Sequence, residues 1–64
     1  MTIRLHYDQE TDAAYLRFSE STVVESEEVA PNVVLDYDSD GRIVGMEVLN
    51  ARRQLPADAL IAAE

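Results

Sequence analysis

The chain has 64 residues, which is enough for one domain. Its 13 acidic and five basic residues give a formal net charge of -8, which repels phosphate backbones and argues against nucleic-acid binding. The chain has no Cys and one His, so disulfides and zinc cages are not available to stabilise so small a domain. A partner chain is the remaining stabiliser, and we expect a homodimer or a basic protein partner.

The start of the chain, Met1 to Leu5, lacks the apolar segment of a signal peptide. No apolar run approaches the ~20 residues of a membrane-spanning helix. We therefore expect no membrane association. Without an export signal or Cys, the expected location is cytoplasmic.

The first half of the chain predicts a hairpin and an acidic edge. Residues 2–7 and 13–18 alternate apolar and polar side chains, and residues 8–12 between them are polar, so the two runs predict strands joined by a turn. Residues 23–29 have a β-branched start and precede a proline, which favours a short acidic edge strand or a loop. Charges on an edge strand also oppose edge-to-edge aggregation.

The second half predicts another hairpin. Residues 33–37 form the first strand, 38–41 the turn and 42–50 the return strand, with Gly41 suited to a positive φ. This hairpin carries apolar residues on both faces, so its sheet needs two covers, such as a helix and a second subunit. Truncating Leu35 or Ile43 is expected to be strongly destabilising if those side chains are core.

The C-terminal segment predicts a short helix or tail over residues 56–64, after a β domain of residues 1–55. Pro56 suits the first turn of a helix, and Asp58 suits its positive end. The expected fold class is α+β, mainly β: a small antiparallel sheet of two β-hairpins plus a short C-terminal helix.

One segment matches a calcium-binding loop pattern. The aspartates 36, 38 and 40, Gly41, Ile43 and Glu47 have EF-hand spacing. An EF-hand loop lies between helices, whereas both flanks here predict strands. In a hairpin, Glu47 lies too far along the return strand to close the ion's shell. We therefore predict a turn and no metal site, and keep cation binding through Asp36–Glu47 as an alternative.

No recognisable catalytic set is present, so we expect no catalytic residue, no cofactor and no enzyme. His6 could act as a general base, but no nucleophile is placed by a motif, and a half-exposed strand histidine is the commoner case. An enzyme assembled only in an oligomer stays an alternative. The aromatic residues Tyr7, Tyr15, Phe18 and Tyr37 are expected to pack in the sheet, and the Tyr-Asp pairs at the turns to anchor the strand ends.

Two stretches carry a family resemblance. They are Tyr7-Asp8-x-x-x-Asp12-Ala13-x-Tyr15-Leu16 and the run from Val33 through Asp40-Gly41-Arg42 to Leu49. The chain resembles the bacterial small-protein family catalogued as domain of unknown function 2283 (DUF2283) over about residues 3–53. The resemblance implies a compact β-rich domain with no catalytic residues to transfer. It also implies a suspected antitoxin-like partnership with a small toxin.

The function expected from these observations is that of a non-catalytic protein-interaction module. Small size, net charge -8 and the apolar residues of the second hairpin point to a homodimer through the sheet. The acidic cluster of Glu25, Glu27 and Glu28 points to a basic partner, although such a run is more often a solvated edge.

Overall fold

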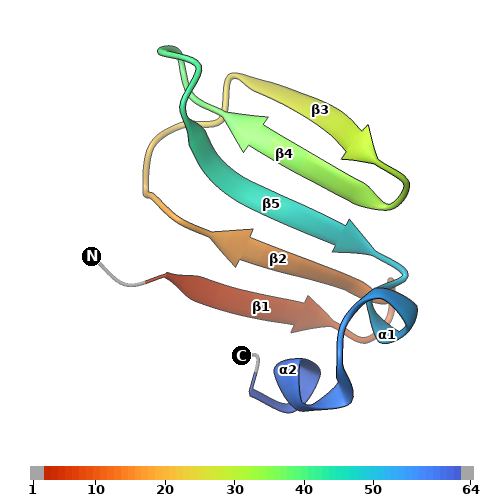
Figure 1. Ribbon diagram of the computed structural model, residues 1–64. Coiled ribbons are helices and arrows are strands. Elements are labelled where there is room, and N and C mark those ends of the chain that lie inside the picture. Colours follow the sequence, from red (N-terminus) through yellow and green to blue (C-terminus); the bar gives the residue numbers. More distant parts are fainter. Residues whose placement is uncertain (1–2, 63–64) are drawn as a thin grey trace.

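The computed structural model describes residues 3–62, which form one antiparallel sheet and two short helices (Figure 1). The strands follow the spatial order β1-β2-β5-β4-β3. Their bounds are β1 Arg4–Asp8, β2 Ala13–Arg17, β3 Glu25–Ala30, β4 Val33–Tyr37 and β5 Ile43–Leu49. The helices are α1 Ala51–Gln54 and α2 Ala57–Ala62. The mainly β fold and both expected hairpins, β1–β2 and β4–β5, are confirmed.

The two faces of the sheet differ in chemistry. Side chains that pair across strands share a face, so register defines an apolar row that crosses four strands. We call this row the leucine row; its members are Leu5, Leu16, Met46 and Leu35. The next row on that face holds Tyr7, Ala14, Val48 and Val33. The helices pack on this apolar face through Ala51, Leu55 and Leu60.

The core is small. Among the described residues, the buried apolar side chains are Ala14, Val44, Val48 and Ala51. Every member of the leucine row is only half-buried. A chain of this size buries roughly 60% of the surface that its unfolded form exposes, so its stability rests on few contacts.

The expectation of a core position for Ile43 at the start of β5 is wrong, and the C-terminal segment holds one helix more than expected. Ile43 is 48% exposed, whereas the next residue, Val44, is buried. The cause is a bulge in β5, which sets Ile43 opposite Tyr37 and Gly45 opposite Asp36. Residues 51–55, at the end of the expected β domain, contain the short helix α1, whose Ala51 is fully buried. The expected helix over 56–64 is α2, ending at residue 62; residues 63–64 lie outside the described part, as does residue 2 of the first expected strand.

Residues with positive φ turn the chain at the ends of the strands. Gly41 has a φ of 77°, as its turn position requires, while Asp12, Asn32 and Asn50 have φ values of 54°, 67° and 54°. Asp and Asn enter this left-handed region more easily than other non-glycine residues. The side-chain amide of Asn50 donates a hydrogen bond of 2.9 Å to the side-chain oxygen of Asn32, which ties the β3–β4 turn to the start of α1.

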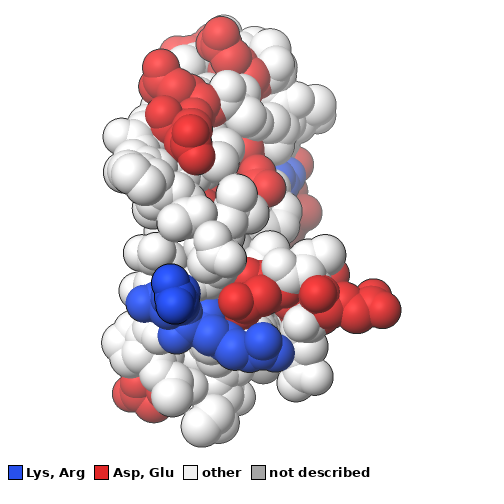
Figure 2. Space-filling view, turned by 90° about the vertical axis from the view of Figure 1, so that its right-hand side faces the viewer, with Lys and Arg blue, Asp and Glu red and all other residues white. Residues whose placement is uncertain are grey.

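Neither helix in residues 3–62 has the length and apolarity needed to cross a membrane. The charges are unevenly placed, as Figure 2 shows for one side of the molecule. A basic band lies at the height of α1, which carries Arg52 and Arg53. Acidic side chains gather at the upper end, at the height of β3.

Candidate functional site

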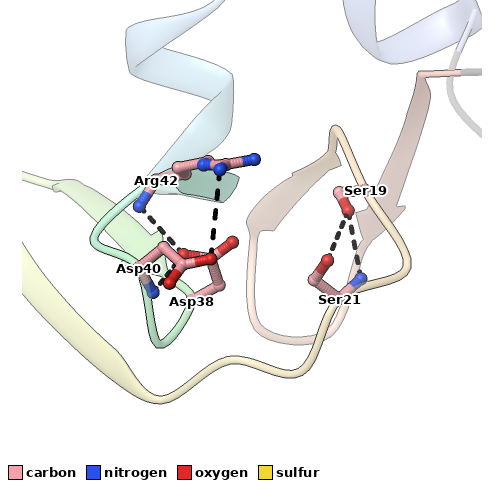
Figure 3. A network of polar contacts seen from close by, with 5 residues as sticks. All are labelled: Ser19, Ser21, Asp38, Asp40 and Arg42. Carbon is pink, nitrogen blue, oxygen red and sulfur yellow. Dashed lines mark hydrogen bonds and ion pairs between the residues drawn. The ribbon is translucent and has the colours of Figure 1, made fainter.

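The aspartate-rich segment is a hairpin turn. Oδ1 of Asp38 accepts hydrogen bonds of 2.9 Å from the backbone amides of both Asp40 and Arg42 (Figure 3). The amide of Gly41 donates to the carbonyl oxygen of Asp38 at 3.1 Å. β4 and β5 flank the turn, which confirms the predicted hairpin. The Asp38 carboxylate therefore holds the turn together from within.

The ion pair of this turn is exposed. Arg42 and Asp40 approach to 4.0 Å with side chains 79% and 70% exposed, so solvent screens the attraction (Figure 3). The hydroxyl groups of Ser19 and Ser21 bond each other at 3.0 Å in the β2–β3 connection. These contacts shape two loops and place no reactive group.

Asp36, the first acidic residue of the calcium-like pattern, is buried in the sheet. It is 1% exposed and lies on β4 opposite Gly45 of β5, on the face away from the helices. Its Oδ1 accepts a 2.6 Å hydrogen bond from the hydroxyl of Ser26 on β3. A Cβ atom on Gly45 would lie 3.3 Å from Oδ2 of Asp36, so the glycine makes room for the carboxylate.

Glu47 meets Asp36 although it lies away from the turn. Glu47 pairs with Val34 on β4, which places it away from the turn, as expected. Its carboxyl group nevertheless lies within hydrogen-bonding reach of Asp36. Burial is the largest cause that raises the pKa of Glu47, followed by the charge of Asp36 and by the hydrogen bond that a protonated Glu47 can donate to Asp36. The EF-hand pattern contains both residues as its first and last acidic positions. It did not predict that the two carboxyl groups contact each other. The sequence signal that could have indicated this contact is Gly45, two residues before Glu47, because a glycine leaves room for a carboxylate from the neighbouring strand.

The polar face continues across β2 and β1. Arg17 donates hydrogen bonds to the hydroxyl of Tyr15 at 3.1 Å and to the carbonyl oxygen of Ser21 at 2.8 Å. Tyr15 lies between His6 and Glu47 in the register of the sheet. His6 is exposed and is separated from the carboxyl pair by a whole strand. Among residues 3–62, no group of three or more His, Asp and Glu side chains could hold a metal ion.

Asp12 joins the first hairpin to α1. Its Oδ1 accepts hydrogen bonds from the hydroxyl of Tyr7 at 2.7 Å and from the backbone amide of Arg52 at 3.1 Å. The Tyr7 hydrogen bond lowers the pKa of Asp12 and raises the pKa of Tyr7. Tyr7 thus anchors the strand end through Asp12, not through the adjacent aspartate that the Tyr-Asp pairs suggested. No local pattern in the sequence signals this contact with α1.

The acidic cluster forms an edge strand, as expected. All six residues of β3 are exposed, including Glu25, Glu27 and Glu28, and Val29 is 48% exposed. In the described part of the chain, no element lies beyond β3, whereas α2 lies beside the opposite edge strand, β1 (Figure 1). The backbone groups on the outer side of β3 are therefore open to another chain.

Tyr37 adds an aromatic ring to this edge. Its hydroxyl donates to Oε1 of Glu27 at 3.4 Å. A shallow hollow of about 350 Å³ is lined by Glu25, Ser26, Glu27, Tyr37 and Gly41. Burial raises the pKa of Tyr37, and the charge of Glu27 adds to that rise. The hollow joins a ring face to carboxylates, a combination that accepts a cationic side chain.

Comparison with protein families gives a decisive match: the model of a family of proteins of unknown function, DUF2283, matches residues 4–52. The chain belongs to the DUF2283 family. This match covers all five described strands and the first half of α1, and leaves α2 outside. Searches of curated proteins and of solved structures found no match. DUF2283 membership assigns no activity, so function has to be argued from the geometry.

Proposed function

We propose that this DUF2283 protein is a non-catalytic protein-interaction module that binds an extended segment of a basic protein along β3. The observation that supports this most is the full exposure of β3 at an edge with no neighbouring element in the described chain. An exposed edge can accept an additional strand, whose main-chain hydrogen bonds supply affinity while side chains supply specificity.

The acidic side chains of β3 favour a partner strand that carries positive charge. Glu25 and Glu27 project on the face that carries Tyr37, and Glu28 projects on the other. A paired strand with Lys or Arg at matching positions would meet opposite charges on both faces. The net charge of -8 would also accelerate the encounter with a basic protein.

The same glutamates disfavour pairing of β3 with a second copy of itself. Two such strands would bring like charges together across the new ladder, which destabilises it. The register shift between Glu28 and Ala30 further interrupts the edge. The bound chain is therefore a different, basic protein, which fits an antitoxin-like role beside a small basic toxin.

Calorimetry with a synthetic strand tests this proposal. The probe is an acetylated and amidated Val-Val-Lys-Lys-Val-Lys peptide, which places a lysine opposite each β3 glutamate in an antiparallel pairing. The same peptide with Glu in place of each Lys is the control ligand. We expect binding of the lysine peptide only. Replacing all three β3 glutamates by Gln should weaken binding by about 5- to 150-fold, since each exposed ion pair contributes about 0.3–1 kcal/mol.

A matched variant separates position from total charge. The triple variant Glu10→Gln, Glu20→Gln and Asp58→Asn removes three exposed charges outside β3 and should bind as the unaltered protein does. Equal weakening by both triple variants would mean that net charge alone attracts the peptide. Undiminished binding after loss of the β3 glutamates would contradict the proposal.

Self-association through the apolar face is a second, separate proposal. The leucine row is continuous over four strands, yet none of its side chains is fully buried. Leu5 and Met46 pack against the core cluster that the helices join, whereas Leu16 and Leu35 lie outside that cluster. A second copy that covers this row would remove apolar surface from water at about 25 cal/mol per Å². Light scattering at tens of micromolar should give the mass of a dimer; a monomer would contradict this proposal.

A further inference from the structure

One buried oxygen atom has no partner in the described part of the chain. Ser26 satisfies Oδ1 of Asp36, whereas Oδ2 is shielded from solvent and accepts no hydrogen bond there. A buried carboxylate oxygen without a donor is strongly destabilising, so native proteins rarely leave one. The side chains on the same face of the sheet are therefore the candidates for a donor to Oδ2.

Glu47 is positioned to supply it. Its carboxyl lies within hydrogen-bonding reach of Asp36, but two ionised carboxylates only accept hydrogen bonds. Adding one proton converts Glu47 into a donor and removes the repulsion between two like charges. A proton also needs no space, whereas a hydrated cation could not reach an oxygen atom that is closed off from solvent.

We propose that Asp36 and Glu47 hold one proton between them, with the Glu47 hydroxyl donating to Oδ2 of Asp36. Since Asp36 also binds Ser26, the proton-sharing pair joins the edge strand β3 to β4 and β5. This makes the polar face of the sheet a pH-sensitive element. The inference does not depend on the partner proposed for β3.

The neighbouring charges fit this arrangement. On β2, the Arg17 guanidinium is already bonded to the hydroxyl of Tyr15 and to the β2–β3 connection. On β1, His6 and Arg4 face the same side beyond β2. On β3, Glu28 lies across Val34 from Glu47, one strand further away than Asp36.

The direction of the pH effect follows from Glu47. Burial and the charge of Asp36 raise the pKa of Glu47 above its ordinary value of 4.5. The stabilising contribution of its proton is therefore complete below pH 4.5 and is lost as the pH rises through the raised pKa. Above that pKa, the ionised and half-buried Glu47 faces the buried carboxyl group of Asp36 beside β3.

Carbon-detected NMR titration of the unaltered protein tests the proposal without any variant. The carboxyl carbon of Glu47 should titrate at a pH above 4.5. Asp36→Asn should move the Glu47 midpoint back toward its ordinary value. A Glu47 midpoint at or below 4.5 in the unaltered protein would overturn the proposal.

Chemical unfolding across about pH 4–9 gives a second readout. Glu47→Gln keeps a donor but cannot ionise, so its midpoint should exceed that of the unaltered protein increasingly as the pH rises. Glu28→Gln removes the same charge from the same face and should retain the original pH dependence. If millimolar Ca²⁺ or Mg²⁺ at about pH 8 restores the stability of the unaltered protein and not of Glu47→Gln, the pair holds a cation and the proton-sharing proposal is wrong.

Discussion

Replacing Gly45 by Ala should destabilise the sheet although the change adds only one methyl group. The new Cβ would lie 3.1 Å from the carbonyl oxygen of Leu16 and 3.3 Å from both Oδ2 of Asp36 and Cε1 of Tyr15. The carbonyl belongs to the backbone of β2 and the carboxylate is buried, so neither can move freely. Overpacking of this kind costs about 1–3 kcal/mol.

The net effect is smaller because Ala restricts the unfolded chain. That restriction favours the folded state by about 0.5–1 kcal/mol, which leaves a net loss centred on about 1 kcal/mol. A 64-residue domain has a total stability of about 3–10 kcal/mol, so the loss is a large fraction. With a urea dependence of about 1 kcal/mol per M, the unfolding midpoint should fall by about 1 M.

The other glycine provides the control. A Cβ atom on Gly41 would meet nothing within 4 Å, but the residue has a φ of 77°, so Gly41→Ala should be destabilising through backbone strain alone. Gly41→Asn should recover part of that loss, because Asn tolerates this conformation, whereas Gly45→Asn should be worse than Gly45→Ala. An unchanged or higher urea midpoint for Gly45→Ala would refute the packing argument.

Three further changes test separate contacts. Ser26→Ala should lower the free energy of unfolding by about 1–3 kcal/mol in urea titrations, because a buried carboxylate oxygen loses its donor; a loss within about 0.5 kcal/mol, typical of surface changes, would argue against the contact. The pKa of Asp12 is lowered, so the stabilisation from its ionised carboxylate is present above pH 3.8 and is lost as the pH falls through the lowered pKa. Tyr7→Phe should therefore weaken the loss of stability in acid, as followed by circular dichroism. An unchanged acid profile would count against the hydrogen bond between Tyr7 and Asp12. Leu35→Ala should be destabilising by about 2 kcal/mol and Ile43→Ala by less than about 1 kcal/mol, and the reverse order in thermal unfolding would contradict the observed burial.

The strands and turns were predictable because their signals are local. Alternation of apolar and polar side chains located both hairpins, and Gly41 located the turn between β4 and β5. The three glutamates before Pro31 located the acidic edge strand, because charge and proline are both tolerated at an edge. These features follow from residues that are close together in the sequence, and they do not depend on how the strands align with one another.

The carboxyl pair was not predictable because it depends on register. Asp36 and Glu47 meet only after β4 and β5 align with a bulge at Val44, and the same bulge exposes Ile43. Short helix α1 was missed for a related reason. It follows a left-handed Asn50 without a side-chain cap, and the backbone amide of its Arg52 bonds Asp12, 40 residues away in sequence.

Mapping the lysine–valine peptide onto the protein by amide NMR tests the central claim about β3 most directly. The account predicts that the largest shifts, and new protection from hydrogen exchange, appear at the amides of Glu25 to Glu28 and at Tyr37 behind them. Shifts that concentrate on β1 or on the helices, with β3 unchanged, would contradict it.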